Sequence, residues 1–263
     1  MKNSSFYIVL FCLLLSVKLA AQENLKFIDN ENLLTKKETA CLEKAIQYEA
    51  DFFNRLFLDK TVDLSAIKFT VATGFMEFIN VQAQAGALHA NASGFFSSRD
   101  STLVVLKNKK SKSNGFLSTC YHELSHAFLH LHVGDKYIPA WFNEGLAEYL
   151  DQMTFDKKKI VHRVNNYGVM RVKTLIELKD LNLSEFVEWN YQTFSQKSFT
   201  QEGYGYAAGY CMVLFLMQQN EERAITIFSN LIGARSTKEV FDRRYAGGFA
   251  QFEKDFIAYI ESK

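Results

Sequence analysis

Proline and cysteine are both scarce in this sequence of 263 residues. A single proline is present, Pro139, which argues against a proline-rich hinge. Four cysteines occur, and three of them, Cys41, Cys120 and Cys211, lie beyond the first 21 residues. Exported domains that rely on disulfides usually carry an even set at close spacings. We therefore expect one bridge at most, and a hydrophobic core that supplies most of the stability.

The sequence also lacks an excess of charge of either sign. Its 30 Lys and Arg residues nearly balance 29 Asp and Glu residues, which gives a formal net charge of +1. No overall field favours nucleic acid or an anionic membrane, and neither is expected as a partner. A local basic run at residues 107–112 precedes Ser-Asn-Gly and predicts a solvated loop.

Long apolar runs are missing as well, apart from one near the start. Lys2 precedes an apolar run at residues 6–17, and Leu-Ala-Ala at residues 19–21 offers small side chains for cleavage. This layout predicts a secretory signal over residues 1–21, and hence a secreted or periplasmic protein with no stable membrane span after cleavage. Another apolar stretch, residues 211–217, is too short to span a bilayer and predicts a buried helix face.

The residues that are present indicate a folded protein with helices and a small sheet. Hydrophobic residues make up 48% of the chain and charged residues 22%, the balance of a globular protein. Apolar positions at helical spacing predict a helix over residues 36–58. Alternating, β-branched and aromatic residues predict short strands at residues 67–71, 93–96 and 102–106.

From residue 115 onward, the pattern predicts only helices and loops. We therefore expect an α+β fold in which residues 22–263 form one unit. A lobe with a helix and a small mixed sheet would occupy residues 22–114. The helices that carry the site would occupy residues 115–152. A mostly helical lobe would occupy residues 153–263.

The most informative stretch reads His122-Glu-Leu-Ser-His126 and has apolar flanks. Four residues of a helix advance about 400° and rise about 6 Å, so the two imidazoles lie on one face and can bind one metal ion. Glu123 lies about 100° around the helix from His122, so it cannot join them as a ligand. Its carboxylate can instead accept a proton from a water that the metal holds, which is the role of a general base.

Two downstream histidines compete for the place of a third ligand. His130 lies about 12 Å along the helix axis from His122, too far to share one ion. His132 has the spacing of the third histidine in the metzincins, a motif that needs a glycine where this sequence has Leu129. Without that glycine the helix continues, and His132 projects about 240° away from His126.

A glutamate is the third candidate. Glu144 lies in Trp141-Phe-Asn-Glu-Gly-Leu-Ala147, and Pro139 just before this segment suits the first turn of a new helix. Glu148 is four residues further on and shares the same face of that helix. One of the two carboxylates can bind the metal while the other orients a ligating histidine.

The two motifs together resemble those of the gluzincin zinc metallopeptidases, especially the peptidase MA-like and membrane alanyl aminopeptidase groups. Those groups carry a Trp-x-Asn-Glu-Gly-x-Ala segment about eighteen residues after the first motif. The resemblance implies a thermolysin-like α+β catalytic domain that hydrolyses peptide or protein substrates. It also implies one zinc ion (Zn2+) per chain on His122, His126 and Glu144. Glu123 would then be the general base, and Glu148 would orient a ligand.

A tyrosine at the start of an apolar segment is a further candidate catalytic residue. The aminopeptidase-like gluzincins carry a tyrosine three residues before a glycine, and Tyr206 and Gly209 fit that pattern by resemblance. The hydroxyl of Tyr206 would donate to the oxyanion of the transition state. Tyr204 and Tyr210 are nearby rivals for this role.

The glutamate with which aminopeptidases bind the substrate's free amine has no counterpart here. The nearest similar segment, residues 86–90, reads Gly-Ala-Leu-His-Ala. We therefore expect an endopeptidase-like activity, with a strand at residues 92–96 beside the cleft. Two alternatives stay open. One is an inactive zinc- or peptide-binding module of the same fold, against which the intact Glu123 argues, and the other is a zinc hydrolase of a non-peptide amide.

Overall fold

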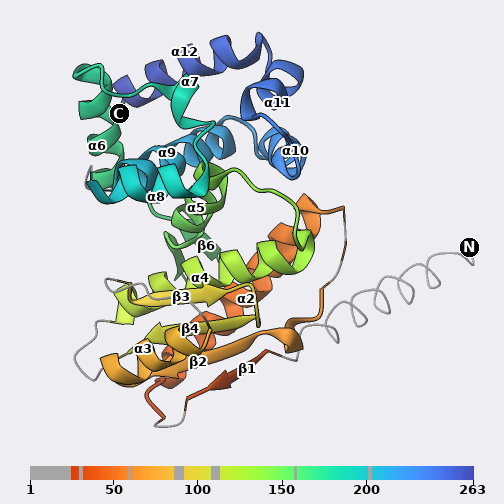
Figure 1. Ribbon diagram of the computed structural model, residues 1–263, viewed down its shortest axis with the longest axis vertical. Helices are drawn as coiled ribbons and strands as arrows, with labels where there is room; N and C mark the ends of the chain where they lie inside the picture. Colours follow the sequence, from red (N-terminus) through yellow and green to blue (C-terminus); the bar gives the residue numbers. More distant parts are fainter. Residues whose placement is uncertain are drawn as a thin grey trace, which may run out of the picture.

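The computed structural model describes residues 25–29, 32–58, 60, 62–85, 92–107, 113–156, 159–200 and 203–263. The predicted secretory signal and the segment at residues 86–90 lie outside these residues. In the described part of the chain, no helix is long and apolar enough to cross a membrane. Figure 1 shows a lower lobe that contains the sheet and an upper lobe of helices, with α4 and α5 between them.

A four-stranded mixed sheet forms the centre of the N-terminal lobe. Its strand order is β1 (Lys26–Ile28), β2 (Lys68–Ala72), β4 (Thr102–Leu106) and β3 (Gly94–Ser97). The first three strands in this order are parallel, and β3 runs antiparallel to β4 along one edge. All three predicted strands are confirmed, whereas the three-residue β1 was too short for its pattern to be recognised.

Helices cover both faces of this sheet. Leu103 and Val105 of β4 belong to the main core together with α2 (Lys36–Leu56) and α4 (Ser113–Val133). Val104, which points to the opposite face, packs with Phe78 of α3 (Phe75–Gln84). The prediction of α2 is confirmed, and a capping box between Thr35 and Glu38 begins this helix. Helix α3 was not predicted.

A β-hairpin in the second half of the chain corrects one prediction. Strands β5 (Met153–Asp156) and β6 (Lys159–His162) pair in antiparallel register, with Thr154 opposite Val161. The prediction that only helices and loops follow residue 115 is therefore wrong. Each strand has four residues and β6 is largely exposed, so neither presents the long alternation by which a strand is recognised.

The remaining helices form the C-terminal lobe around α9 (Tyr204–Gln219), which is buried on nearly every side. The predicted buried helix face is confirmed, because the side chains of residues 211–216 are all buried there. The three cysteines within the described residues are free thiols. The α+β class is confirmed. The helices before and after α9 are α5 (Ala140–Leu150), α6 (Asn166–Glu177), α7 (Leu183–Phe186), α8 (Tyr191–Thr200), α10 (Glu221–Leu231), α11 (Thr237–Arg244) and α12 (Gly248–Glu261).

Candidate functional site

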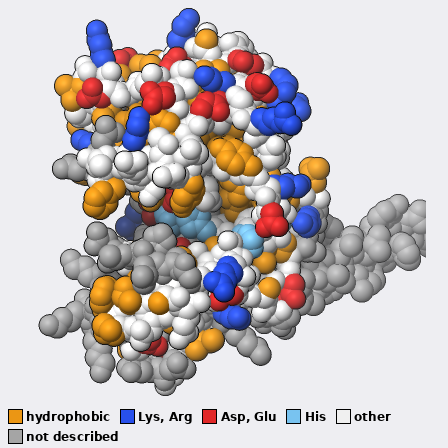
Figure 2. Space-filling view, in the orientation of Figure 1, with side chains coloured by type: hydrophobic (Ala, Val, Ile, Leu, Met, Phe, Trp, Pro, Cys, Tyr) orange, Lys and Arg blue, Asp and Glu red, His pale blue; other side chains and the backbone are white. Residues whose placement is uncertain are grey.

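A cleft of about 410 Å³ lies between the two lobes. Figure 2 shows histidine side chains inside this hollow. Its walls come from β3, α4, α5, α8 and α9, so both lobes contribute to it. The residues that the sequence analysis selected all line it: His122, Glu123, His126, Glu144, Glu148 and Tyr206.

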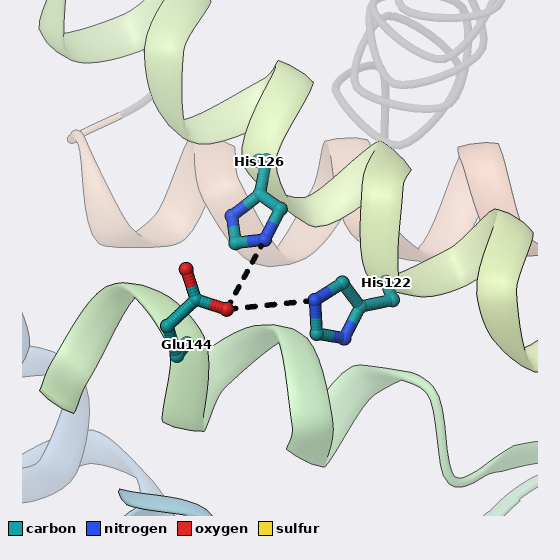
Figure 3. Close-up of side chains that lie close together, drawn as sticks. All are labelled: His122, His126 and Glu144. Atoms are coloured by element: carbon teal, nitrogen blue, oxygen red, sulfur yellow. Dashed lines mark ion pairs between the residues drawn. The ribbon is translucent and has the colours of Figure 1, made fainter. Parts of the chain in front are cut away.

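Two histidines and one glutamate converge on a common point in this cleft (Figure 3). Oε2 of Glu144 lies 3.6 Å from Nε2 of His122 and 3.6 Å from Nε2 of His126. Ligand atoms at about 2.0–2.2 Å from one tetrahedral ion lie about 3.3–3.6 Å from one another, so these atoms fit a metal ion. The three residues form a group able to hold one.

A close crossing of two helices places the side chains of α5 and α9 around this point. A Cβ added to Gly145 would lie 2.4 Å from the carbonyl oxygen of Gly209, and one added to Gly209 would lie 2.6 Å from the carbonyl oxygen of Trp141. Only glycine permits such an approach of two backbones. Glu144 directly precedes one of these glycines and Tyr206 lies one turn before the other, so the crossing brings both residues to the cleft.

The second nitrogen of each histidine also has a partner on α5. Nδ1 of His126 lies 3.0 Å from Oδ1 of Asn143, within hydrogen-bond distance. This contact leaves the other ring nitrogen, Nε2, facing Glu144. Nδ1 of His122 lies 3.8 Å from Oε1 of Glu148, an ion-pair separation rather than a hydrogen bond. Asn143 thus orients one imidazole through a direct contact, and Glu148 acts on the other from a longer distance.

The charges around the histidines favour a cation in the cleft. Burial acts to lower the pKa of His122, but the carboxylates of Glu144, Glu123 and Glu148 outweigh it and raise this pKa to about 10. Burial acts to raise the pKa of Glu144, yet the imidazoles of His126 and His122 lower it to about 2. Carboxylates that stabilise a positive charge on His122 are also suited to hold a metal ion.

Glu123 lies beside the two histidines but points toward the sheet lobe. Its side chain is almost fully buried and lines the cleft next to β3. A Cβ on Gly94 would come within 2.8 Å of the Glu123 carboxylate oxygen Oε1 and within 2.5 Å of Thr119. The edge strand therefore approaches this carboxylate as closely as a glycine allows, which restricts where the carboxylate can move.

The rival histidines occupy other surroundings. His132 is 5% exposed, and its ring nitrogens lie 2.8 Å from the Phe128 carbonyl oxygen and 3.0 Å from the Lys60 carbonyl oxygen. His130 lines a second cavity of about 290 Å³ and packs against Phe96. Both residues lie apart from the His122 and His126 pair, as the geometry of the helix predicted.

The three tyrosines of α9 also lie in different surroundings. Tyr206 lines the cleft, and burial raises its pKa with help from the nearby carboxylates, so its hydroxyl stays protonated and able to donate. Tyr204 packs against Phe186 and Trp189 in the core. The hydroxyl of Tyr210 accepts a 2.8 Å hydrogen bond from the backbone N–H of Asn165.

Three further residues of the site were not predicted from the sequence: Asn143, Asp151 and Tyr191. Asn143 lies in the segment Trp141–Ala147, where its position next to Glu144 could have indicated a role in the site. Asp151 lines the cleft just after α5, where burial and the nearby Glu148 raise its pKa to about 8. Tyr191 lies 47 residues after Glu144, to which its hydroxyl donates a hydrogen bond, and no local pattern links the two.

One family resembles part of the chain. Residues 116–242 match the model of a family described as "Protein of unknown function (DUF1570)". The match extends from α4 into α11 and contains every candidate site residue, while the sheet lobe lies outside it. No curated protein matches this sequence. The description of the family names no activity.

Proposed function

We propose that this chain is a zinc-dependent peptidase of the gluzincin type that cleaves within peptide chains. One observation carries the proposal. Oε2 of Glu144 lies 3.6 Å from Nε2 of both His122 and His126, and Glu123 lines the same cleft. Two imidazole nitrogens, one carboxylate oxygen and space for a further ligand make up the donor set of a catalytic zinc site.

The chain's own residues can supply the remaining chemistry. When bound, zinc would polarise the substrate's carbonyl group and make a water molecule more acidic. Glu123 accepts the proton of the attacking water and returns it to the leaving amine. Tyr206 donates a hydrogen bond to the oxyanion that forms on the carbonyl. Asn143 and Glu148 hold the imidazoles in the orientation that presents Nε2 to the metal.

The shape of the cleft supports cleavage inside a chain rather than at its end. The second cavity shares Phe96, His126 and Tyr191 with the cleft, so the hollow continues past the candidate metal site. Strand β3 lies at one end of the strand order, and its residues 94–96 line the cleft together with residues 92 and 93 just before it. An extended peptide can pair with such an edge strand through backbone hydrogen bonds.

Metal content and peptide digestion test this proposal together. The purified chain should hold about one zinc ion, measured by mass spectrometry of the metal, and should cleave internal bonds in a broad peptide library. Glu123→Gln keeps the shape of the side chain but cannot accept the proton. This variant should retain zinc and lose hydrolysis by about 10²–10⁴-fold. A wild-type chain that takes up no zinc, or a Glu123→Gln variant with near-normal turnover, would refute the proposal.

A further inference from the structure

Glu144 uses its two carboxylate oxygens for different partners. Oε2 faces the two imidazoles, whereas Oε1 accepts a hydrogen bond from the hydroxyl of Tyr191. Rotation about the last bond of a glutamate side chain is broad, so the carboxylate turns readily unless a partner restrains it. Glu144 is only 3% exposed, so its carboxylate has little contact with bulk water that could play this part.

The position of Tyr191 is fixed by the packing of α8 in the C-terminal lobe. Tyr191 is the first residue of α8, and α8 packs closely against α9. A Cβ on Gly205 of α9 would lie 2.2 Å from Oγ of Ser198 and 2.7 Å from the ring of Phe194, both on α8. The hydroxyl of Tyr191 is therefore presented to Glu144 by a helix that cannot shift easily.

Tyr191 is more exposed than a side chain that packs in the core. Its side chain is 55% exposed, and it lines both the cleft and the second cavity. A half-exposed ring contributes little to the core, so the hydrogen bond to the buried Glu144 is its main specific contact among the described residues. This combination indicates a role in the site rather than in folding.

We propose that Tyr191 is a positioning residue that restrains Glu144 by occupying Oε1, so that Oε2 alone is presented to the metal beside His122 and His126. This inference rests on the proposed function, because it takes Glu144 as a metal ligand. Without the hydroxyl, the carboxylate turns and offers both oxygens. Partners of this kind contribute about 10–100-fold to metal affinity or activity.

Cobalt substitution tests the inference without knowledge of the substrate. The visible absorption of bound Co²⁺ reports the number and type of its donor atoms. Tyr191→Phe should change that spectrum relative to the wild-type chain and lower Co²⁺ affinity by about 10–100-fold, measured by competition with a chromophoric chelator. Tyr167→Phe, which alters a tyrosine that is 73% exposed on α6, is the matched control and should change neither quantity.

Thermal unfolding of the metal-free variants separates positioning from a structural role. A structural role for Tyr191 would lower the melting temperature of metal-free Tyr191→Phe and leave the Co²⁺ spectrum of the loaded variant as in the wild type. That result, or an unchanged affinity together with an unchanged spectrum, would overturn the inference while the proposed function stands. Failure of the wild-type chain to bind Co²⁺ or Zn²⁺ would overturn both.

Discussion

The middle and the C-terminal end of α4 carry histidines in opposite surroundings. In the middle of the helix, His122 and His126 face the carboxylate of Glu144 across the cleft. One to two turns later, His132 is enclosed by backbone carbonyls and stacks on the ring of Phe57 at 4.7 Å. One helix thus holds a candidate metal site and a buried structural histidine within eleven residues.

The difference between the middle and the end of α4 lies in what packs against the helix rather than in the helix itself. The middle of α4 meets α5, which contributes Glu144 and Glu148 next to each other on one face. The end of α4 meets the end of α2 and Lys60, whose carbonyl and ammonium groups both contact His132. Carboxylate side chains can bind a metal ion beside the imidazoles. The carbonyls and aromatic rings around His132 form a closed core, which leaves a metal no open position for a further ligand.

The largest expected effect is a loss of metal binding, which tests the contrast between His132 and the pair His122 and His126. His122→Ala removes one of three proposed ligands and should abolish most metal binding, measured as zinc per chain after dialysis. Glu144→Ala should have a similar effect. His132→Ala should keep the metal, because its ring lies in the core between Phe128 and Lys60.

The reverse pattern would break the comparison. If His132→Ala lost its zinc while Glu144→Ala retained it, the metzincin-like ligand set would be the correct one. Far-UV circular dichroism of each variant would confirm that the helices remain, since a loss of fold would remove the site for another reason.

The same contrast recurs on α9, where Tyr206 faces the cleft and Tyr210 binds a backbone N–H. If Tyr206 donates to the oxyanion, its hydroxyl acts mainly in the transition state. Tyr206→Phe should therefore lower kcat and kcat/KM together by about 10–1,000-fold, with little change in KM or zinc content. Steady-state kinetics on a peptide found in the library digest would measure this effect.

Tyr210→Phe is the matched control for that experiment. It removes the acceptor of the Asn165 N–H and should lower the free energy of unfolding by about 1 kcal/mol, with normal turnover. A larger loss of kcat in Tyr210→Phe than in Tyr206→Phe would assign the oxyanion role to the other tyrosine. Normal turnover in both variants would leave the oxyanion to the metal alone.

Local spacing accounts for the parts of the site that the sequence predicted. His122 and His126 lie four apart in a helix, and Glu144 lies in a second helix whose motif is recognisable within seven residues. The glycines of the helix crossing, Gly145 and Gly209, also lie inside the quoted motifs, although their packing role appears only in three dimensions.

Long-range contacts account for the parts that the sequence missed. Tyr191 reaches Glu144 because α8 is packed on α9, a relation that depends on Gly205 and not on any spacing between the two residues. The fold shows the same division. The long helix α2 was predicted from its own periodicity, whereas the short strands β5 and β6 are stabilised by pairing with each other and carry a weak local pattern.

The smallest predicted effect concerns the pH dependence that His132 gives to stability. Burial lowers the pKa of His132, and the nearby Lys60 ammonium also lowers it. The hydrogen bonds to the Phe128 and Lys60 carbonyls act to raise this pKa, but the lowering effects are larger. Its pKa in the folded chain is thus below the unfolded value of about 6.5. As the pH falls below about 6.5, the unfolded chain takes up a proton first. The stability contribution is therefore fully present above that pH and is lost as the pH falls toward the folded pKa, with a slope of at most about 1.4 kcal/mol per pH unit.

His132→Gln isolates this effect, because the amide does not titrate while it can still donate to one of the carbonyls. His162 has a lowered pKa as well, but it is present in both proteins and cancels in the comparison. Urea unfolding between pH 5 and 8 should show that the stability advantage of the wild-type chain over the variant is constant near neutral pH and shrinks in acid. An advantage that grows in acid would mean that the Phe128 and Lys60 carbonyls hold His132 as a cation. The end of α4 would then resemble its middle in binding positive charge, and the contrast between the two parts of the helix would fail.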